Sequence, residues 1–203
     1  MTSKATLGAL LHDWYAAMSP NWSPTTARQT KSVIDCHLVP NLGDLQLQTL
    51  RTEDIDAFYG QLRRRGGRDG QQLSAGTVHR VHVVLHRALA QALRWEWIWV
   101  NPASSASPPS CEPAPIYPPS PEEVIRLLSH VSTADPEFHT FLSLAVSTGA
   151  RRSQLGALHW GEIDLERGQI GFLRALLDAK GGPVLRPTKT GGTYRVNLDA
   201  DCL

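Results

Sequence analysis

Apolar residues recur at helical spacing through the first hundred residues of the chain. In residues 5–18, Leu7, Leu10 and Trp14 take the i, i+3 and i+7 positions that share one side of a helix. The same periodicity covers three further stretches, residues 24–38, 52–62 and 75–97. The pattern therefore predicts four helices in the first half of the chain.

Capping residues and a proline mark the expected ends of these helices. Ser23 and Ser74 stand where a side chain can cap a helix N-terminus. Thr52 is followed by two acidic residues, which favour the positive end of a helix dipole. Pro40 is expected to end the second helix at residue 37 or 38, because proline has no N–H to donate. Residues 63–72 are polar and rich in glycine, so they are predicted to connect the third helix to the fourth.

A proline-rich stretch follows the fourth helix. Residues 103–120 contain six of the 14 prolines of the chain, together with several serines. Proline fixes φ and lacks a donor, so this stretch is predicted to be an extended linker between two domains.

The residues after the linker are predicted to form further helices. Ser120 and Glu123 have the spacing of a capping box, and Asp135-Pro136 opens the next helix. The apolar run 142–146 at the end of that helix is expected to be buried. Thr148-Gly149 should then form a turn into a second amphipathic helix that continues through Leu158.

The pattern changes to strands after residue 164. Three segments have the composition or alternation of strands, namely residues 169–173, 184–188 and 194–198. Residues 189–192, Lys-Thr-Gly-Gly, are expected to form the hairpin turn between the last two strands. The fold class is therefore predicted to be mainly α with a small β-sheet.

Composition limits the function only weakly. The chain has 203 residues, 41% of them hydrophobic, and a formal net charge of +1. It contains no apolar run of the ~20 residues that cross a bilayer and no signal-peptide layout, so we expect a cytoplasmic protein without a membrane partner. The total charge gives no argument for nucleic-acid binding, which would have to rest on local basic clusters.

Two such clusters occur. Arg63, Arg64 and Arg65 open the polar connection, where a solvated loop and a contact with DNA backbone are equally good interpretations. Arg151 and Arg152 follow the expected buried turn, and an arginine there would need an anion, because an unpaired buried charge costs several kcal/mol or more. The planar guanidinium suits phosphate oxygens in particular.

Three histidines on the fourth helix could also carry chemistry. His79, His82 and His86 have spacings that allow them to share one face. A metal site would need a further ligand nearby, and the sequence supplies none. We therefore favour a polar face near phosphate over a zinc site, and we expect no metal or other cofactor.

Around the second basic cluster the chain resembles the tyrosine recombinases, also called phage integrases. The pattern is Thr-Gly-x-Arg, a polar residue three positions later, a Leu-x-x-Leu helix, Trp and Ile-Asp. The residues that match are Thr148, Gly149, Arg151, Gln154, Leu155, Leu158, Trp160, Ile163 and Asp164. Gln154 is a departure, because Glu is more usual there.

The first half of the chain resembles the N-terminal core-binding domain of the same family. The matching segments are 22–25, 37–43, 73–78 and 98–103. The resemblance implies a four-helix, SAM-like DNA-binding domain in residues 1–103, a linker in 104–119 and the first part of an α+β catalytic domain in 120–203. The implied partner is double-stranded DNA, with a possible homo-oligomer on the DNA.

The resemblance also implies roles for particular residues. In this family a tyrosine attacks a DNA phosphate, arginines stabilise the charge that develops, and a hairpin lysine protonates the leaving 5′ oxygen. Arg151 and Lys189 stand at the arginine and lysine positions. We expect further DNA contacts from Arg63, Arg64, Arg65, Thr77, His79, Arg80 and Arg152.

None of the four tyrosines follows the His-x-x-Arg segment that precedes the nucleophile in this family. The sequence is therefore expected to be the N-terminal part of an integrase that binds DNA without cleaving it, with residues 120–203 poorly stable alone. Two alternatives stay open. One is an enzyme completed by residues beyond those given, and the other is a helical protein-interaction module or inactive remnant that does not bind DNA.

Overall fold

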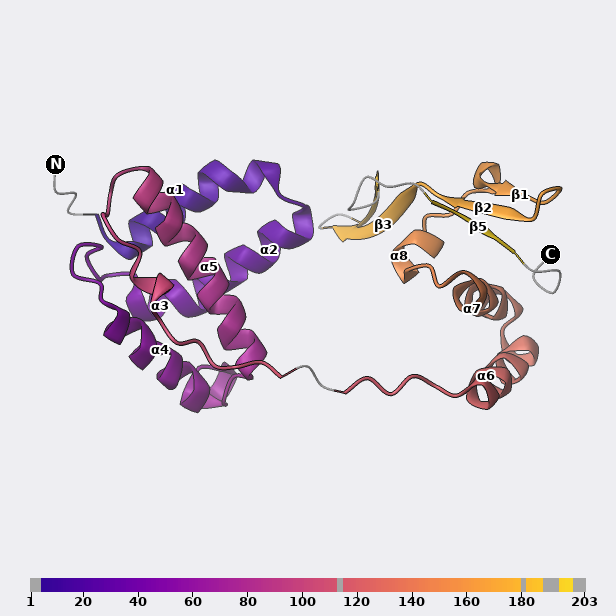
Figure 1. The fold of residues 1–203 in the computed structure, drawn as a ribbon, viewed down its shortest axis with the longest axis horizontal. Helices are drawn as coiled ribbons and strands as arrows, with labels where there is room; N and C mark the ends of the chain where they lie inside the picture. The colour runs from indigo at the N-terminus through magenta and orange to yellow at the C-terminus, as the bar shows by residue number, and fades with distance from the viewer. Residues whose placement is uncertain (1–4, 113–114, 180–181, 188–193, 199–203) are drawn as a thin grey trace. The chain divides into compact units, whose positions relative to one another are not determined.

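The structure is a computed structural model, and it describes residues 5–112, 115–179, 182–187 and 194–198. The chain divides into two compact units, residues 1–114 and 115–203, each of which is described by itself (Figure 1). The finer division into a domain, a linker from 104 to 119 and a second domain stays a prediction.

The first unit is helical, as the sequence predicts. Its principal helices are α1 (Leu7–Met18), α2 (Pro24–Val33), α3 (Val39–Leu42), α4 (Thr52–Arg65) and α5 (Ala75–Arg94). Ser23 and Ser74 cap α2 and α5, each accepting a hydrogen bond from the backbone N–H three residues later. Short 3₁₀ turns cover Ser19–Asn21, Arg68–Gly70 and Pro102–Ser104.

One continuous hydrophobic core holds these helices together, and α5 runs through it (Figure 1). Seven residues of α5 are buried, at positions 78, 81, 84, 85, 88, 89 and 92. They recur every three or four residues, so one side of this long helix faces the core and the opposite side faces solvent. Fully buried residues of α1 and α4, among them Leu10 and Ile55, belong to the same core.

Pro40 does not end the second helix, contrary to the prediction. The chain passes from α2 into a π-helical turn at Ile34–Leu38 and then directly into α3, which contains Pro40. In the wider turn the Val39 N–H donates to the Ile34 carbonyl, and the Asn41 side chain donates to the carbonyl of His37 at 2.7 Å. The π turn thus accommodates Pro40, which has no backbone N–H to donate to an α-helical hydrogen bond.

The three consecutive arginines belong to α4 and not to the connection after it. The helix continues through Arg65, since arginine is a good helix former and cations favour the C-terminal end of a helix. It ends at Gly66, where an added Cβ would lie 2.6 Å from Leu62 Cα. A side chain at this position would therefore collide with the preceding turn.

The fourth helix is shorter than predicted, and the tryptophans after it do not all pack alike. The helix α5 ends at Arg94, and Trp95 and Trp97 pack against the core with ring centroids 5.5 Å apart. Trp99 is 82% exposed. Trp95 and Trp97 therefore form an edge of the core, whereas Trp99 does not.

The beginning of the proline-rich segment is attached to the first unit. The Ser107 N–H donates to Asp56 Oδ1 of α4 at 2.7 Å, and Ala106 packs against the core. Thr52 Oγ1 donates to the Pro102 carbonyl at 2.9 Å. Residues 106–112 and 115–120 contain no helix or strand, as expected of a proline-rich segment.

The second unit combines helices with short strands (Figure 1). The helices α6 (Pro121–Ala134) and α7 (Pro136–Thr148) begin where the sequence predicts, with the capping box of Ser120 and Glu123 and with Asp135 as N-cap. A four-residue helix, α8 (Arg152–Leu155), and a 3₁₀ turn at Trp160–Glu162 follow. The strands are β1 (Ile163–Asp164), β2 (Gln169–Phe172), β3 (Arg174–Ala179), β4 (Gly182–Pro187) and β5 (Tyr194–Asn197).

The predicted pairing of the last two strands is wrong. The strand β4 pairs with β3, which the sequence analysis missed, and β5 pairs with β2 to complete an antiparallel sheet in the order β1-β2-β5. The register places Ile170 opposite Val196, and both contribute to the core of the unit. Burial of Ile170 and Val196 therefore favours the pairing of β5 with β2 over a hairpin of β5 with β4, the strand that precedes it in the chain.

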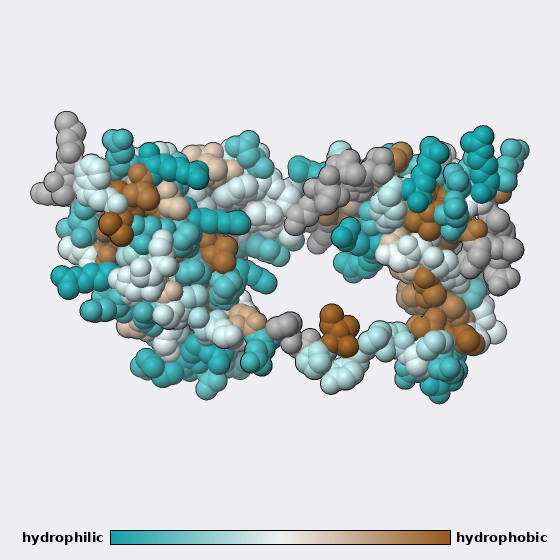
Figure 2. All heavy atoms as spheres, in the orientation of Figure 1, coloured by the Kyte–Doolittle hydropathy of each residue, from teal (hydrophilic) through white to brown (hydrophobic). Residues whose placement is uncertain are grey.

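The apolar run at the end of α7 is less buried than predicted. No residue of α7 is fully buried, and Val146 is 56% exposed. Among the described residues, the core cluster of this unit contains three buried residues, Leu155, Ile170 and Phe172. Hydrophobic side chains gather on the visible surface over α7 (Figure 2).

The second amphipathic helix is also shorter than predicted. After α8 the chain turns at Gly156, where the Ala157 and Leu158 N–H groups donate to carbonyls three residues back. Leu155 and Ala157 are buried, so the apolar spacing was read correctly but is carried by a tight turn. Among the described residues, no helix is both long and apolar enough to cross a bilayer.

The packing of α5 can be tested with two leucines of the same helix. Leu85 is fully buried and Leu93 is 41% exposed. We expect Leu85→Ala to lower the free energy of unfolding of the first unit by about 2–5 kcal/mol, because it leaves a cavity in the core. Leu93→Ala should have a much smaller effect. Native-state hydrogen exchange at the α5 amides measures both, and equal losses would contradict the assignment of the core face.

Candidate nucleic-acid interface

The end of α4 and the start of α5 bring most of the predicted DNA contacts together. The two helices meet at this end, where the Leu73 N–H donates to the Leu62 carbonyl at 3.2 Å. Arg64 and Arg65 lie on one side of this junction and His79 and Arg80 on the other, and all four are exposed. The folded chain thus joins two clusters that lie about 15 residues apart in the sequence.

Two of the predicted contacts have structural roles in this junction. Arg63 Nη1 donates to the Leu73 carbonyl at 2.8 Å and so ties the connection to α4. Thr77 is half-buried, and its Oγ1 lies 2.9 Å from Ser74 Oγ at the cap of α5. These bonds explain both residues without DNA, although a second donor of the Arg63 guanidinium could still reach an anion.

The solvent side of α5 carries a row of arginines that the sequence analysis missed in part. Arg80, Arg87 and Arg94 are exposed and recur every seven residues, or about two helical turns, so they share one face. The helix contains no acidic residue. Among the described residues, none of the three takes part in an ion pair. The seven-residue spacing was visible in the sequence and would have identified Arg87 and Arg94.

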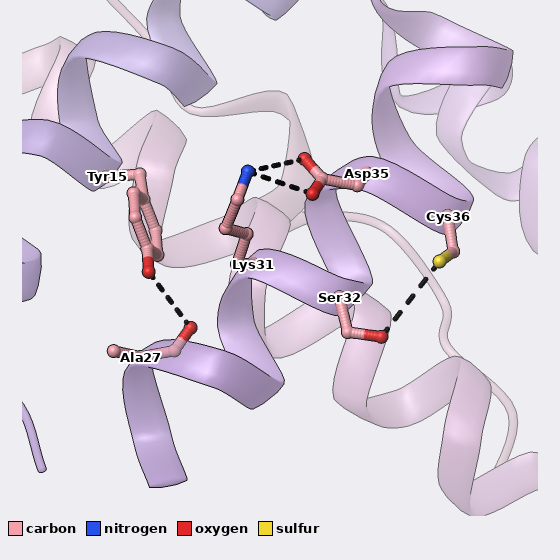
Figure 3. Close-up of polar contacts among 6 residues, drawn as sticks. All are labelled: Tyr15, Ala27, Lys31, Ser32, Asp35 and Cys36. Atoms are coloured by element: carbon pink, nitrogen blue, oxygen red, sulfur yellow. Dashed lines mark hydrogen bonds and ion pairs between the residues drawn. The ribbon is translucent and has the colours of Figure 1, made fainter. Parts of the chain in front are cut away.

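By contrast, Lys31 of α2 is already paired with a carboxylate. Lys31 Nζ lies 2.9 Å from Asp35 Oδ2 and 3.3 Å from Asp35 Oδ1, and it sits 5.8 Å from the centre of the Tyr15 ring (Figure 3). The hydrogen bond and charge of Asp35 raise the pKa of Lys31. Tyr15 in turn donates to the Ala27 carbonyl at 3.3 Å (Figure 3). This surface offers less free positive charge than α5.

The three histidines of α5 form a row beside α4. The ring centroids of His79 and His82 are 6.0 Å apart, and those of His82 and His86 are 5.8 Å apart. Tyr59 of α4 holds the middle ring, with its hydroxyl 2.8 Å from His82 Nδ1. Burial lowers the pKa of His82, and positive charge on His86 and His79 lowers it further. Burial also raises the pKa of Tyr59, so the phenol stays protonated.

These histidines do not complete a metal site in the described residues. No group of three or more histidine, cysteine, aspartate or glutamate side chains there has a geometry that could hold a metal ion. Two of the three rings are instead engaged by hydroxyl groups, those of Tyr59 and Ser104. The row is therefore a polar face of the helix.

The second unit contains the turn around which the sequence motif is organised. Gly149 ends α7 with φ of 63°, a left-handed conformation that favours glycine, and its N–H donates to the Ala145 carbonyl at 3.0 Å. Thr148 Oγ1 accepts a hydrogen bond from the Ala150 N–H at 3.2 Å. The Thr-Gly pair thus sets the direction in which the chain leaves α7 and places Arg151 at the start of α8.

Arg151 and Arg152 are exposed, which corrects the expectation of a buried arginine turn. The helix α7 before them is itself half-exposed, so the turn lies at the surface of this unit. Neither guanidinium is paired with a carboxylate in the described residues. Because the two arginines are exposed, they do not require an anion to compensate for burial. Both side chains can still bind one.

Gln154 is the buried polar residue of this site. Its Oε1 accepts hydrogen bonds from the Arg151 N–H at 3.1 Å and from the Tyr194 hydroxyl at 3.2 Å. It thereby connects the start of α8 to β5, which lies 40 residues further along the chain. The neutral amide of Gln154 thus caps the start of α8 in the way that a glutamate carboxylate would.

A second polar anchor holds the sheet beside this turn. Glu162 Oε1 accepts from Arg174 Nε at 3.2 Å and Nη2 at 2.8 Å, and the Glu162 side chain is only 7% exposed. Glu162 Oε2 accepts from the His159 N–H at 3.0 Å. The sequence analysis missed this pair, because nothing in the spacing of residues 162 and 174 joins them.

Lys189, the predicted general acid, lies outside the described residues. In the chain it falls between β4 and β5, which are not partners of each other. The expected hairpin of β4 and β5 is therefore corrected, whereas the role of Lys189 stays a prediction.

The connection made by Gln154 can be tested directly. Gln154→Ala removes the acceptor of two hydrogen bonds in a buried position, so we expect the second unit to lose about 1–3 kcal/mol of stability. Hydrogen exchange at the Arg151 amide should become faster. Gln169→Ala is the matched control, since Gln169 bonds to Asn197 on the exposed side of the sheet. Equal effects of the two substitutions would contradict this role of Gln154.

Known proteins match both the sequence and the fold. Residues 6–63 match the family described as phage integrase, N-terminal SAM-like domain. An integrase of Streptomyces ambofaciens is 26% identical over 165 residues, which cover 79% of this chain and 39% of that protein. The chain thus spans about two fifths of the length of this curated relative.

Solved structures of integrases share the fold of nearly the whole chain. The Tn1549 transposon integrase in complex with a circular intermediate DNA has a TM-score of 0.84 at 18% identity, covering 98% of this chain and 62% of that one. A lambda integrase dimer bound to a core site has a TM-score of 0.73 at 18% identity, covering 97% and 64%. The chain is therefore similar to known integrases in sequence and shares their fold, and its residues 6–63 match the N-terminal SAM-like domain of phage integrases.

Proposed function

We propose that this chain binds double-stranded DNA as part of a site-specific recombinase, with the solvent side of α5 against the DNA backbone. The observation that carries the proposal is the row of Arg80, Arg87 and Arg94 on a helix without acidic residues. Arginines without a protein partner can each bind a phosphate through two parallel hydrogen bonds. Such contacts displace the cations around DNA and so favour binding.

The junction of α4 and α5 extends this surface. Arg64 and Arg65 are free at the end of α4, next to His79 and Arg80 at the start of α5. Together they form a basic area on a protein whose net charge is only +1. Local concentration of charge, and not the total, is what the binding of a DNA backbone requires. The Tn1549 integrase was solved in complex with a circular intermediate DNA and the lambda integrase dimer bound to a core site, which supports the same partner here.

In the second unit we propose that Arg151 binds the phosphate at which the DNA strand is cut. Arg151 is exposed and has no carboxylate partner among the described residues. The turn at Gly149 and the bond of its N–H to Gln154 fix its position. A positive group held in advance stabilises the negative charge that gathers on phosphate oxygens in the transition state. Arg152 would contact a neighbouring phosphate, and Lys189 would protonate the leaving 5′ oxygen.

We propose further that residues 1–203 by themselves hold DNA without cutting it. None of their tyrosines follows a His-x-x-Arg segment, so the nucleophile implied by the family is not among them. Several copies would assemble on one DNA molecule, as in the lambda integrase dimer on its core site.

DNA binding can be measured by fluorescence anisotropy with a labelled duplex of about 30 base pairs at several salt concentrations. We expect Arg80→Ala and Arg87→Ala each to weaken binding and to lower the slope of log K against log salt by about 0.9 for each lost phosphate contact. Arg126→Ala is the control, because Arg126 is an exposed arginine of α6. Failure of the folded chain to bind at low salt would overturn the proposal and favour a protein-interaction module.

The role of Arg151 has its own test in the same assay. We expect Arg151→Ala to reduce affinity further than Arg126→Ala does, because only Arg151 is placed at the motif turn. A smaller salt slope for Arg151→Ala would indicate a lost phosphate contact. Unchanged affinity and slope would show that this residue does not touch the DNA.

A further inference from the structure

The histidine row of α5 lies beside the proposed DNA-binding arginines on the same helix. His79 and His86 are seven residues apart and therefore point in nearly the same direction, one on each side of His82. The planes of neighbouring rings are tilted by only 38° and 40°. The three side chains thus form a continuous strip about two helical turns long.

The middle residue is fixed differently from the two outer ones. His82 is tied to the buried Tyr59 hydroxyl at 2.8 Å, and burial together with its two histidine neighbours lowers its pKa. His79 is exposed and makes no such bond in the described structure, while His86 is half-buried with Nε2 3.3 Å from Ser104 Oγ. The outer histidines are therefore held by fewer or longer hydrogen bonds than the central one.

Few other charges act on this strip. From α4, Tyr59 contacts His82, Asp56 lies one turn away, and Arg63 bonds to the loop before α5. Asp56 uses Oδ1 to accept the Ser107 N–H, and among the described residues it forms no ion pair with a histidine. From the segment after α5, Ser104 is the polar side chain that reaches the row. Arg80 and Arg87 are the adjacent cations on α5 itself.

The helices α1 and α2 pack on α5 as well, but from the side of the hydrophobic core. Burial lowers the pKa of His82, and the charges of His86 and His79 lower it further. Among the residues that the structure describes, no carboxylate forms an ion pair with His79 or His86. An anion brought by a ligand would be their principal source of stabilisation.

We propose that His79 and His86 form part of the DNA-binding surface and take up protons when DNA binds, so that affinity rises as the pH falls. This inference rests on the proposed function, since it requires DNA against α5. A neutral imidazole adds no charge to the surface, whereas an imidazolium adds one positive charge and donates from both ring nitrogens. His82 remains neutral between them and keeps the two charges apart.

The sign of the effect follows from linkage. A phosphate next to an imidazole favours its charged form and raises its pKa above about 6.5 in the complex. The extra affinity is then fully present below the pKa of the free histidine and is lost as the pH rises through the higher pKa of the complex. A rise of about one pKa unit makes binding about sixfold tighter at about pH 6 than at about pH 8 for each histidine.

The test measures the dissociation constant of the 203-residue chain and a DNA duplex at about pH 6 and about pH 8, with ionic strength held constant. We expect binding about 30-fold tighter at the lower pH if both outer histidines gain a proton. His79→Gln and His86→Gln should each lower this ratio of dissociation constants by a factor of about six, and the double variant should abolish most of the pH dependence. His12→Gln and His130→Gln, exposed histidines on α1 and α6, are matched controls and should leave the ratio unchanged.

The outcomes separate this inference from the proposed function. Binding at about pH 8 that disappears at high salt supports DNA binding whatever the histidines do. If the double variant keeps the full pH ratio, the inference is wrong while the proposed function stands. If the folded wild-type chain does not bind at either pH, both fail.

Nuclear magnetic resonance of the unsubstituted chain provides a second measurement that does not depend on the variants folding. The imidazole C–H signals give the pKa of each histidine with and without DNA. We expect the pKa values of His79 and His86 to rise by about one unit on binding, and those of His12 and His130 to stay within a few tenths. Unchanged values at His79 and His86 in a saturated complex would overturn the inference.

Discussion

Burial of one side of α5 is the constraint on which the first unit depends. Its seven buried residues meet side chains from α1, α2 and α4, so the helix cannot rotate about its axis without exposing them. Because the apolar side is fixed, the opposite side is fixed as well. The arginine row therefore occupies a defined position, although none of its members takes part in an ion pair within the described residues. The hydrophobic core thus orients the polar side of the helix.

Much of this fold could be predicted from periodicity and capping. Ser23, Ser74 and Ser120 mark true helix starts, because a serine cap acts on the N–H groups a few residues away. The failures concern interactions that depend on distant residues or on unusual geometry. Pro40 was misread because a π turn and a side-chain bond from Asn41 supply what the proline lacks. The partner of β5 was predicted wrongly because its pairing with β2 joins Ile170 to Val196, which lie 26 residues apart in the sequence.

In the candidate site, too, the features that depend on neighbouring residues could be predicted and the contacts between distant residues could not. The sequence motif located the turn of the second unit and its arginine, since both depend on neighbouring residues. It could not show that Gln154 bonds to Tyr194 or that Glu162 bonds to Arg174, because folding alone brings these pairs together. It also assigned DNA contacts to Arg63 and Thr77, whose side chains stabilise the junction of α4 and α5. The side chain of a basic or polar residue near a helix end can stabilise that end by hydrogen bonding to nearby groups of the chain.

The arginine row of α5 has a consequence for the protein before it meets any ligand. Arg80, Arg87 and Arg94 are separated by about 10 Å, which is close to the Debye length at about 0.1 M salt, and no acidic residue of the helix lies between them. Their mutual repulsion raises the energy of the free fold at low ionic strength. Added salt therefore screens this repulsion and stabilises the free protein, while it weakens a complex held by the same side chains. Ionic strength acts in opposite directions on the two states, and the conditions that best preserve the isolated chain are those in which it holds a polyanion least tightly.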